Sequence, residues 1–186
     1  NTAKEIAQIF GSGAYVDGGI IGPPAHSSGT TRLYLSGQHA QMVASWFSQG
    51  ALEAIALPEG DGAEAMVAAS ALKITYAAYS KGHSALLLAV NALASSSGVS
   101  EVLNAEWNIS QPGLTQRSNA AAKATAPKAW RFAGEMREIS ATFKAQGLNG
   151  DFHQGAAEIY ASMENLKDQP DADLAQVIDE IIGAKT

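Results

Sequence analysis

The sequence predicts an α+β fold that is mostly helical, with a small, incomplete α/β part over residues 1–60 and a helical part over residues 61–186. In the first part, short apolar runs alternate with glycine and proline turns, which is typical of short strands and helices. In the second part, apolar residues recur at the spacing of amphipathic helices. The chain has 186 residues, 46% of them hydrophobic, so it can bury a substantial core.

The α/β part begins with a short helix. Thr2 and Glu5 have the spacing of a capping box, and the glycines of residues 11–13 end the helix. Residues 14–17 then predict a buried strand that runs into a glycine- and proline-rich loop over residues 18–24. A polar loop over residues 25–31 leads to a strand over 32–36, a helix over 41–47 and a strand over 52–57. This part is about half the size of an ordinary domain and needs a neighbour to complete its sheet.

The helical part begins with one long helix over residues 62–97, rich in alanine, leucine and methionine. Further helices are predicted over residues 99–107, 129–146, 152–163 and 173–182, separated by prolines and glycines. The last of them gathers its apolar residues on one face and therefore docks on an apolar surface. These residues are Leu174, Val177, Ile178, Ile181 and Ile182.

Composition and charge exclude several classes of function. The chain has 12 basic and 18 acidic residues and a net charge of −6, so it lacks the basic face that binds nucleic acid. It has no cysteine, which suits a cytoplasmic protein. The four histidines show no metal-binding spacing, and we predict no metal site. Neither a secretion signal nor a membrane span is indicated. Because the chain begins at Asn1 within a helix, we expect an upstream segment.

A largely polar stripe, which contains small hydroxyls and no carboxylate, follows one side of the long helix and consists of Ser70, Lys73, Tyr76, Ala77, Ser80 and Ser84. The stripe is either a solvated face or the lining of a cavity, and its hydroxyls without carboxylates favour the cavity. A lysine partly withdrawn from water can exchange a proton with a substrate hydroxyl. Lys73 is the best placed for this role. Lys81 and His83 follow two to three turns later, and His83 is interpreted as a core or surface histidine.

Two glycine-rich segments lie near the start of the chain. The loop of residues 18–24 is either a tight structural turn or a place where the backbone approaches a small ligand. Residues 11–13, Gly-Ser-Gly, begin like a dinucleotide-binding fingerprint, but Val16 stands where the third glycine belongs. We therefore expect no pyrophosphate binding there.

Several motifs together resemble the 6-phosphogluconate dehydrogenase-like and β-hydroxyacid dehydrogenase superfamily, in a little-characterised branch. They are YVDGGIIGPP (15–24), SALK (70–73), YAA (76–78), KG (81–82), KAWRF (128–132), GEM (134–136), FHQ (152–154) and AAEIY (156–160). The resemblance covers essentially the whole chain. It implies the tail end of a Rossmann domain, then a long helix and an all-helical domain.

The resemblance also implies a function. The chain would be the C-terminal part of an NAD(P)-dependent dehydrogenase for a small hydroxylated, hydroxyacid-like substrate, with Lys73 as general acid and base. NAD or NADP would bind to an upstream half, because the phosphate loop is absent here. The chain alone would be inactive, and its helical domain would form a homodimer. The implied substrate-binding residues are Gly19, Ile20, Ile21, Gly22, Pro23 and Tyr76.

The sequence departs from the superfamily pattern at three places. Tyr76 and Ala77 stand where an asparagine usually follows the lysine, and Ile21 replaces a serine before the usual glycine pair. A second lysine is missing from the helix that holds Glu135. These changes exclude the transfer of any named substrate. The rival interpretation is a non-catalytic helical module for dimerisation or small-molecule binding, and a separate polypeptide supplying the missing half is a third possibility.

Overall fold

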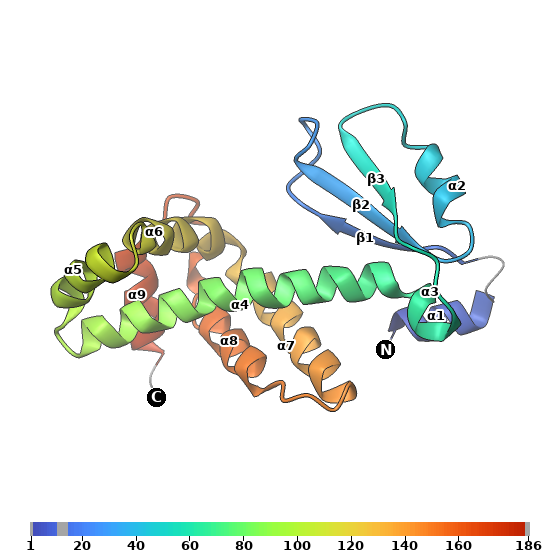
Figure 1. The fold of residues 1–186 in the computed structure, drawn as a ribbon. Coiled ribbons are helices and arrows are strands. Elements are labelled where there is room, and N and C mark those ends of the chain that lie inside the picture. Colours follow the sequence, from blue (N-terminus) through green and yellow to red (C-terminus); the bar gives the residue numbers. More distant parts are fainter. Residues whose placement is uncertain (1, 11–14, 185–186) are drawn as a thin grey trace. The chain divides into compact units, whose positions relative to one another are not determined.

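The computed structural model describes residues 2–10 and 15–184 and divides the chain into two compact units, residues 1–76 and 77–186. We call them the N-terminal unit and the helical unit. The division falls within α4 (Ala68–Ser96), the longest helix of the described chain. The N-terminal unit holds a three-stranded sheet with short helices, and the helical unit contains helices alone among its described elements (Figure 1).

The sheet of the N-terminal unit is mixed. Strand β1 (Asp17–Ile21) pairs with β2 (Thr31–Ser36) in antiparallel fashion, and β2 pairs with β3 (Leu52–Ala56) in parallel. Helix α2 (Ala40–Ser45) connects the two parallel strands and packs on both. Before the sheet, α1 (Thr2–Phe10) packs on α3 (Gly62–Met66), and Lys4 forms an ion pair with Glu64 between them.

The helical unit continues α4 and adds five further helices and two short 3₁₀ turns within the described residues. Alanines fill many of its buried positions, which lets the helices approach closely. Helices α7 and α8 make the most extensive helix pair, and α6 packs on both α5 and α9. The added elements are α5 (Ser100–Ser110), α6 (Leu114–Thr125), η2 (Ala126–Lys128), α7 (Ala129–Ala145), α8 (Asp151–Ala161), η3 (Glu164–Leu166) and α9 (Leu174–Gly183).

The structure corrects three local predictions. Residues 18–21, predicted as loop, belong to β1, because pairing with β2 outweighs the low strand propensity of glycine. The predicted single helix over 62–97 is broken at Val67, whose side chain is buried, so that α3 and α4 are separate. The sequence does not predict helix α6, because Pro112-Gly113 and Pro127 indicate only breaks between helices. Gly113, at φ 84°, instead serves as its N-cap.

Other predictions can be compared directly. Helix α9 carries the expected apolar face, and Val177 is its buried centre. The predicted strand over 14–17 contributes only Asp17 to β1, and residue 14 lies outside the described residues. The predicted capping box involves the side chain of Thr2, and the predicted helix stop involves residues 11–13, so both also lie outside the described part of the chain.

Candidate functional site

The first turn of α4 is capped by side chains from the sheet. The backbone N–H of Ser70 donates to Asp17 Oδ2 at 2.6 Å, and the Ser70 hydroxyl donates to Asp17 Oδ1 at 2.6 Å. The N–H of Ala69 donates to Ser36 Oγ at 3.0 Å. Val67, which precedes the helix, offers no side-chain acceptor, so β1 and β2 supply the cap instead. A carboxylate at this end also interacts favourably with the helix dipole.

Gly19 brings β1 into direct contact with α4. A Cβ atom at this position would lie 2.6 Å from the carbonyl oxygen of Ala69 and 3.2 Å from Lys73 Cβ. Only glycine allows this separation, because the obstructing oxygen belongs to the helix backbone. Two residues predicted for the site, Gly19 and Lys73, therefore meet within the N-terminal unit.

Lys73 itself is exposed, and it makes no hydrogen bond or ion pair with any described residue. The sequence predicts a lysine partly withdrawn from water, and this prediction is wrong, because Lys73 is exposed in this chain. The reason is geometric, because only the Cβ end of the side chain packs against β1. Tyr76, three residues later on α4, is 53% exposed.

The other predicted substrate-binding residues divide between the two faces of β1. Ile21 is buried and shares a face with Gly19, whereas Ile20 points to the opposite face and is half exposed. Gly22 and Pro23 are exposed and begin the loop that connects β1 with β2. Ile20 is thus not brought together with Lys73.

Three consecutive side chains fix the loop between β1 and β2. The Thr30 hydroxyl donates to the carbonyl of Ser27 at 2.6 Å, and that of Thr31 donates to the carbonyl of Pro23. Arg32 Nη1 donates to the carbonyl of Gly29 at 3.3 Å. The loop is exposed, but these bonds give it a defined conformation. It lies next to the sheet face where Gly19 of β1 contacts Lys73 of α4.

The sequence analysis assigns no site role to Asp17, Ser36, Tyr15 or Arg32, although the motif over 15–24 includes Tyr15 and Asp17. Tyr15 lies 3.4 Å from Asp17 Oδ1, and burial, followed by the nearby Asp17 charge, raises the pKa of its phenol. The available signal for Asp17 was a single carboxylate at the end of a predicted buried strand, where a charged residue needs a partner. Nothing local in the sequence shows that Ser36 faces a helix 33 residues further on.

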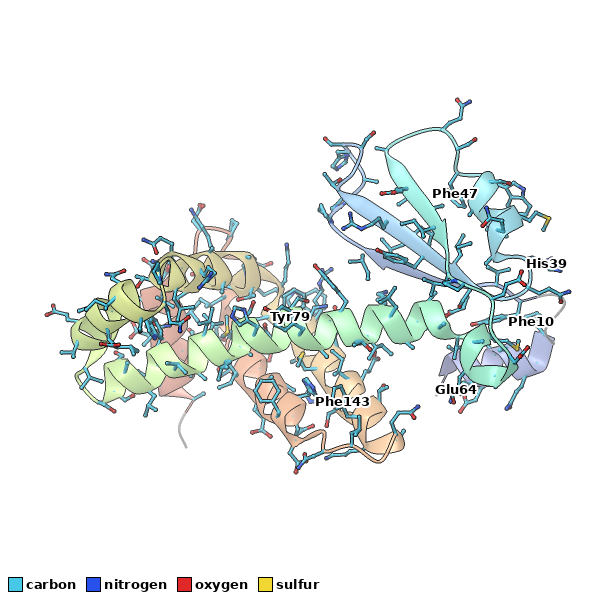
Figure 2. The ribbon with its side chains drawn as sticks, in the orientation of Figure 1. Phe10, His39, Phe47, Glu64, Tyr79 and Phe143 are labelled. Atoms are coloured by element: carbon cyan, nitrogen blue, oxygen red, sulfur yellow. The ribbon has the colours of Figure 1, made fainter. Side chains whose placement is uncertain are left out.

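The helical unit contains a separate polar cluster around Lys81. Lys81 Nζ lies 2.5 Å from Glu135 Oε2 on α7 and 4.9 Å from the centre of the Phe132 ring. The hydroxyl of the fully buried Tyr160 donates to the carbonyl of Lys81 at 2.8 Å, and burial raises the pKa of that phenol. These contacts hold α4 against α7 and α8, so Lys81 has a structural role. His83 stacks on Tyr79, which Figure 2 labels, at 5.7 Å between ring centres.

Among the described residues, no three histidine, aspartate or glutamate side chains lie close enough together to hold a metal ion. A cavity of about 420 Å³ opens at the carboxyl ends of β2 and β3, lined in part by Gly37, Gln38, Glu59 and Met66. Lys73 does not line it. No helix in the described part of the chain is long and apolar enough to cross a membrane.

Comparison with known proteins finds one partial match to a family model. Residues 94–163 match the model of DUF1932, a domain of unknown function. A search of curated proteins finds no match.

Solved structures resemble most of the chain. A conserved hypothetical protein from Sinorhizobium meliloti 1021 is 22% identical with a TM-score of 0.69, over 91% of this chain and 57% of that one. The conserved protein MTH1747, of unknown function, is described as structurally similar to 3-hydroxyacid dehydrogenases. It is 22% identical with a TM-score of 0.61, over 84% of this chain and 58% of its own.

The chain thus has an α+β, mostly helical fold similar to that of 3-hydroxyacid dehydrogenases, as the sequence predicted. At this level of identity the likeness establishes the fold, and it spans less than three fifths of both solved chains.

Proposed function

We propose that the chain is the C-terminal part of an NAD(P)-dependent oxidoreductase acting on a small hydroxylated, hydroxyacid-like substrate. Lys73 acts as general acid and base, and Gly19 to Pro23 with Tyr76 position the substrate. The observation that carries this proposal is the approach of Gly19 to Lys73, which joins the glycine-rich segment to the candidate base. The similarity of fold to 3-hydroxyacid dehydrogenases supports the class of reaction.

Lys73 has a simple task in this chemistry. Its neutral amine takes the proton of the substrate hydroxyl on oxidation, and its ammonium form returns a proton on reduction. An exposed ammonium group is well solvated, whereas exclusion of water favours the neutral form. Because Lys73 is exposed here, we propose that segments outside these 186 residues cover it in the working enzyme, and that the chain alone is inactive.

The described residues do not fit a dinucleotide. A pyrophosphate binds where a glycine-rich turn leads from a strand into the N-terminus of a helix. In the described chain, β2 and β3 are followed by α2 and α3, which have only six and five residues. We therefore place the NAD(P) site in a further half, either upstream in a longer polypeptide or on a separate chain.

We also propose that the helical unit forms a homodimer. Leu86 and Leu93 lie seven residues apart on α4, and both are exposed. Beside Leu93, a groove of about 200 Å³ is lined almost wholly by apolar side chains of α4, α8 and α9. Exposed apolar surface of this kind is typical of an interface between subunits.

The test of the catalytic proposal is Lys73→Met, made in the polypeptide extended by its dinucleotide-binding half. We expect turnover of 3-hydroxy acids with NAD or NADP to fall by roughly a hundredfold or more, because the proton acceptor is lost. The melting temperature should not change, since Lys73 has no polar partner among the described residues.

Lys123→Met provides the matched control, because Lys123 is exposed on α6, in the other unit. This variant should keep full turnover. If Lys73→Met also retained full turnover, Lys73 would not be the general base. The rival interpretation, a non-catalytic helical module, would gain support if the extended protein turned over no hydroxy acid at all.

A further inference from the structure

Arg32 is a basic residue on the face of the sheet that carries the candidate site, the same face as Asp17. The antiparallel register pairs Gly19 with Tyr34 and Ile21 with Arg32, and directly paired residues share a face. This face of the sheet is the one that packs against α4, as Ser36 shows. Ser36 belongs to the pair that lies two residues beyond the Gly19–Tyr34 pair on β2. Ser36 bonds to the N–H of Ala69 on the helix.

The separation between Arg32 and Lys73 suits a small ligand. Lys73 packs against Gly19, and Arg32 belongs to the pair that lies two residues further along β1. Two residues of a strand span roughly 7 Å. Lysine and arginine side chains are both long enough to reach a molecule of a few carbon atoms that lies between them.

Most of the binding capacity of Arg32 is unused. A guanidinium has five N–H donors, and Arg32 uses one of them, toward the carbonyl of Gly29. Its register neighbour on β3 is Glu53, yet no described carboxylate lies within ion-pair distance of Arg32. A guanidinium without a carboxylate partner, held in place by its bond to the loop at Gly29, is suited to binding a planar anion in bidentate fashion.

We propose that Arg32 binds the carboxylate of the substrate, while Lys73 serves its hydroxyl. This inference rests on the proposed function and refines it, because it assigns one residue of this chain to the carboxylate of the hydroxy acid. It makes Arg32 a specificity-determining residue. The sequence motifs did not include it, because its significance depends on the pairing of β1 with β2.

The test is a titration of the 186-residue chain, followed by NMR, with 3-hydroxypropanoate and with 1,3-propanediol. The two probes differ in a carboxylate against a hydroxymethyl group. We expect Arg32→Gln to weaken 3-hydroxypropanoate binding by roughly tenfold to a hundredfold, the usual effect of losing a hydrogen-bonded charge. Binding of the diol should not change.

Thr30→Ala is the control for loop integrity, since it removes the Thr30 bond to Ser27 and leaves Arg32 in place. If Thr30→Ala weakened binding as much as Arg32→Gln, the role of Arg32 would be to hold the loop, and the proposal would be wrong. It would also be overturned if the wild-type chain bound both probes equally or neither, or if Arg32→Gln had no effect. Retention of turnover by Lys73→Met would instead refute the proposed function and leave the anion site standing.

Discussion

The two units differ in how completely they bury their apolar side chains. The helical unit contains most of the large side chains that are fully buried, among them Tyr160, Leu88 and Met136. In the N-terminal unit the buried apolar residues are fewer, and several of them are alanines. There, Ile9 and Phe10 on α1 and Trp46 after α2 are each more than 60% exposed (Figure 2 labels Phe10).

This difference has a physical consequence for the site. Large apolar side chains are seldom left exposed on adjoining elements unless another surface covers them. Both units expose such side chains, since the helical unit also exposes Leu93, Val102 and Ile109, so both offer surfaces to partners. The N-terminal unit, which carries Lys73 and Gly19, differs in having fewer large buried side chains of its own. The exposed α1 and the open edges of the sheet are the surfaces where we expect the dinucleotide-binding half to pack.

The largest effect should come from the core of the helical unit. Met136→Ala removes a completely buried side chain on α7, and we expect it to lower the free energy of unfolding by about 2–5 kcal/mol. Urea denaturation followed by circular dichroism measures the change. Leu93→Ala is the control, because Leu93 is 67% exposed on α4, and it should cost well under 1 kcal/mol in the monomer. Equal losses from both variants would contradict the placement of Met136 in the core of the helical unit and of Leu93 on its surface.

A smaller effect is expected in the N-terminal unit at Gly19. In Gly19→Ala the new methyl group would lie 2.6 Å from the carbonyl oxygen of Ala69, so β1 and α4 must move apart. We expect a loss of about 1–3 kcal/mol in the free energy of unfolding, typical of overpacking. Binding of 3-hydroxypropanoate should weaken as well, because Lys73 moves with the helix.

Gly18→Ala is the matched control on the same strand. Its methyl group would meet Leu33 and Leu35 at 3.5 and 3.6 Å, which are ordinary contacts. The free energy of unfolding should stay within about 0.5 kcal/mol of the wild type. If the two alanine variants behaved alike, the close approach of β1 to α4 would not be a feature of the folded protein.

The sequence predicted most of the secondary structure because apolar spacing is a local signal. Seven elements begin and end within a few residues of their predicted ranges, namely β2, α2, β3, α5, α7, α8 and α9. The errors occur where tertiary contacts decide the local structure. Gly18 to Ile21 form a strand only because β2 pairs with them, and α4 begins after Val67 because Asp17 and Ser36 cap it there.

For the candidate site, the sequence provided residues but not their mutual geometry. Lys73 and Gly19 were both predicted, and the structure brings them into contact. Ile20 is among the predicted substrate-binding residues because it adjoins the glycines in the chain. Strand alternation nevertheless turns its side chain to the face of the sheet opposite Gly19. Arg32 was missed for the converse reason, since it reaches the same face as Gly19 through a register that spans 11 positions of sequence, from Ile21 to Arg32.

The smallest effect should be a pH dependence in the helical unit, at His153 on α8. Its side chain is buried between Phe143, which Figure 2 labels, and Phe152, with ring centres at 4.4 and 5.2 Å. Its Nδ1 has no hydrogen-bond partner among the described residues. Burial lowers the pKa of His153 below its ordinary value of 6.5, because the charged imidazolium loses its hydration in this apolar environment.

The direction of the pH effect follows from proton uptake. Below pH 6.5 the unfolded chain binds a proton at His153 more readily than the folded protein does. The contribution of the neutral side chain is therefore complete above that pH and is lost as the pH falls toward the lowered folded value. Urea denaturation between about pH 5.5 and 7.5, where histidine titrates, should show wild-type stability decreasing with acidity. The decrease should be shallower in His153→Leu, which cannot titrate. If the two proteins lost stability in parallel, His153 would be protonated equally in both states, and its burial between the two phenylalanine rings would not persist in solution.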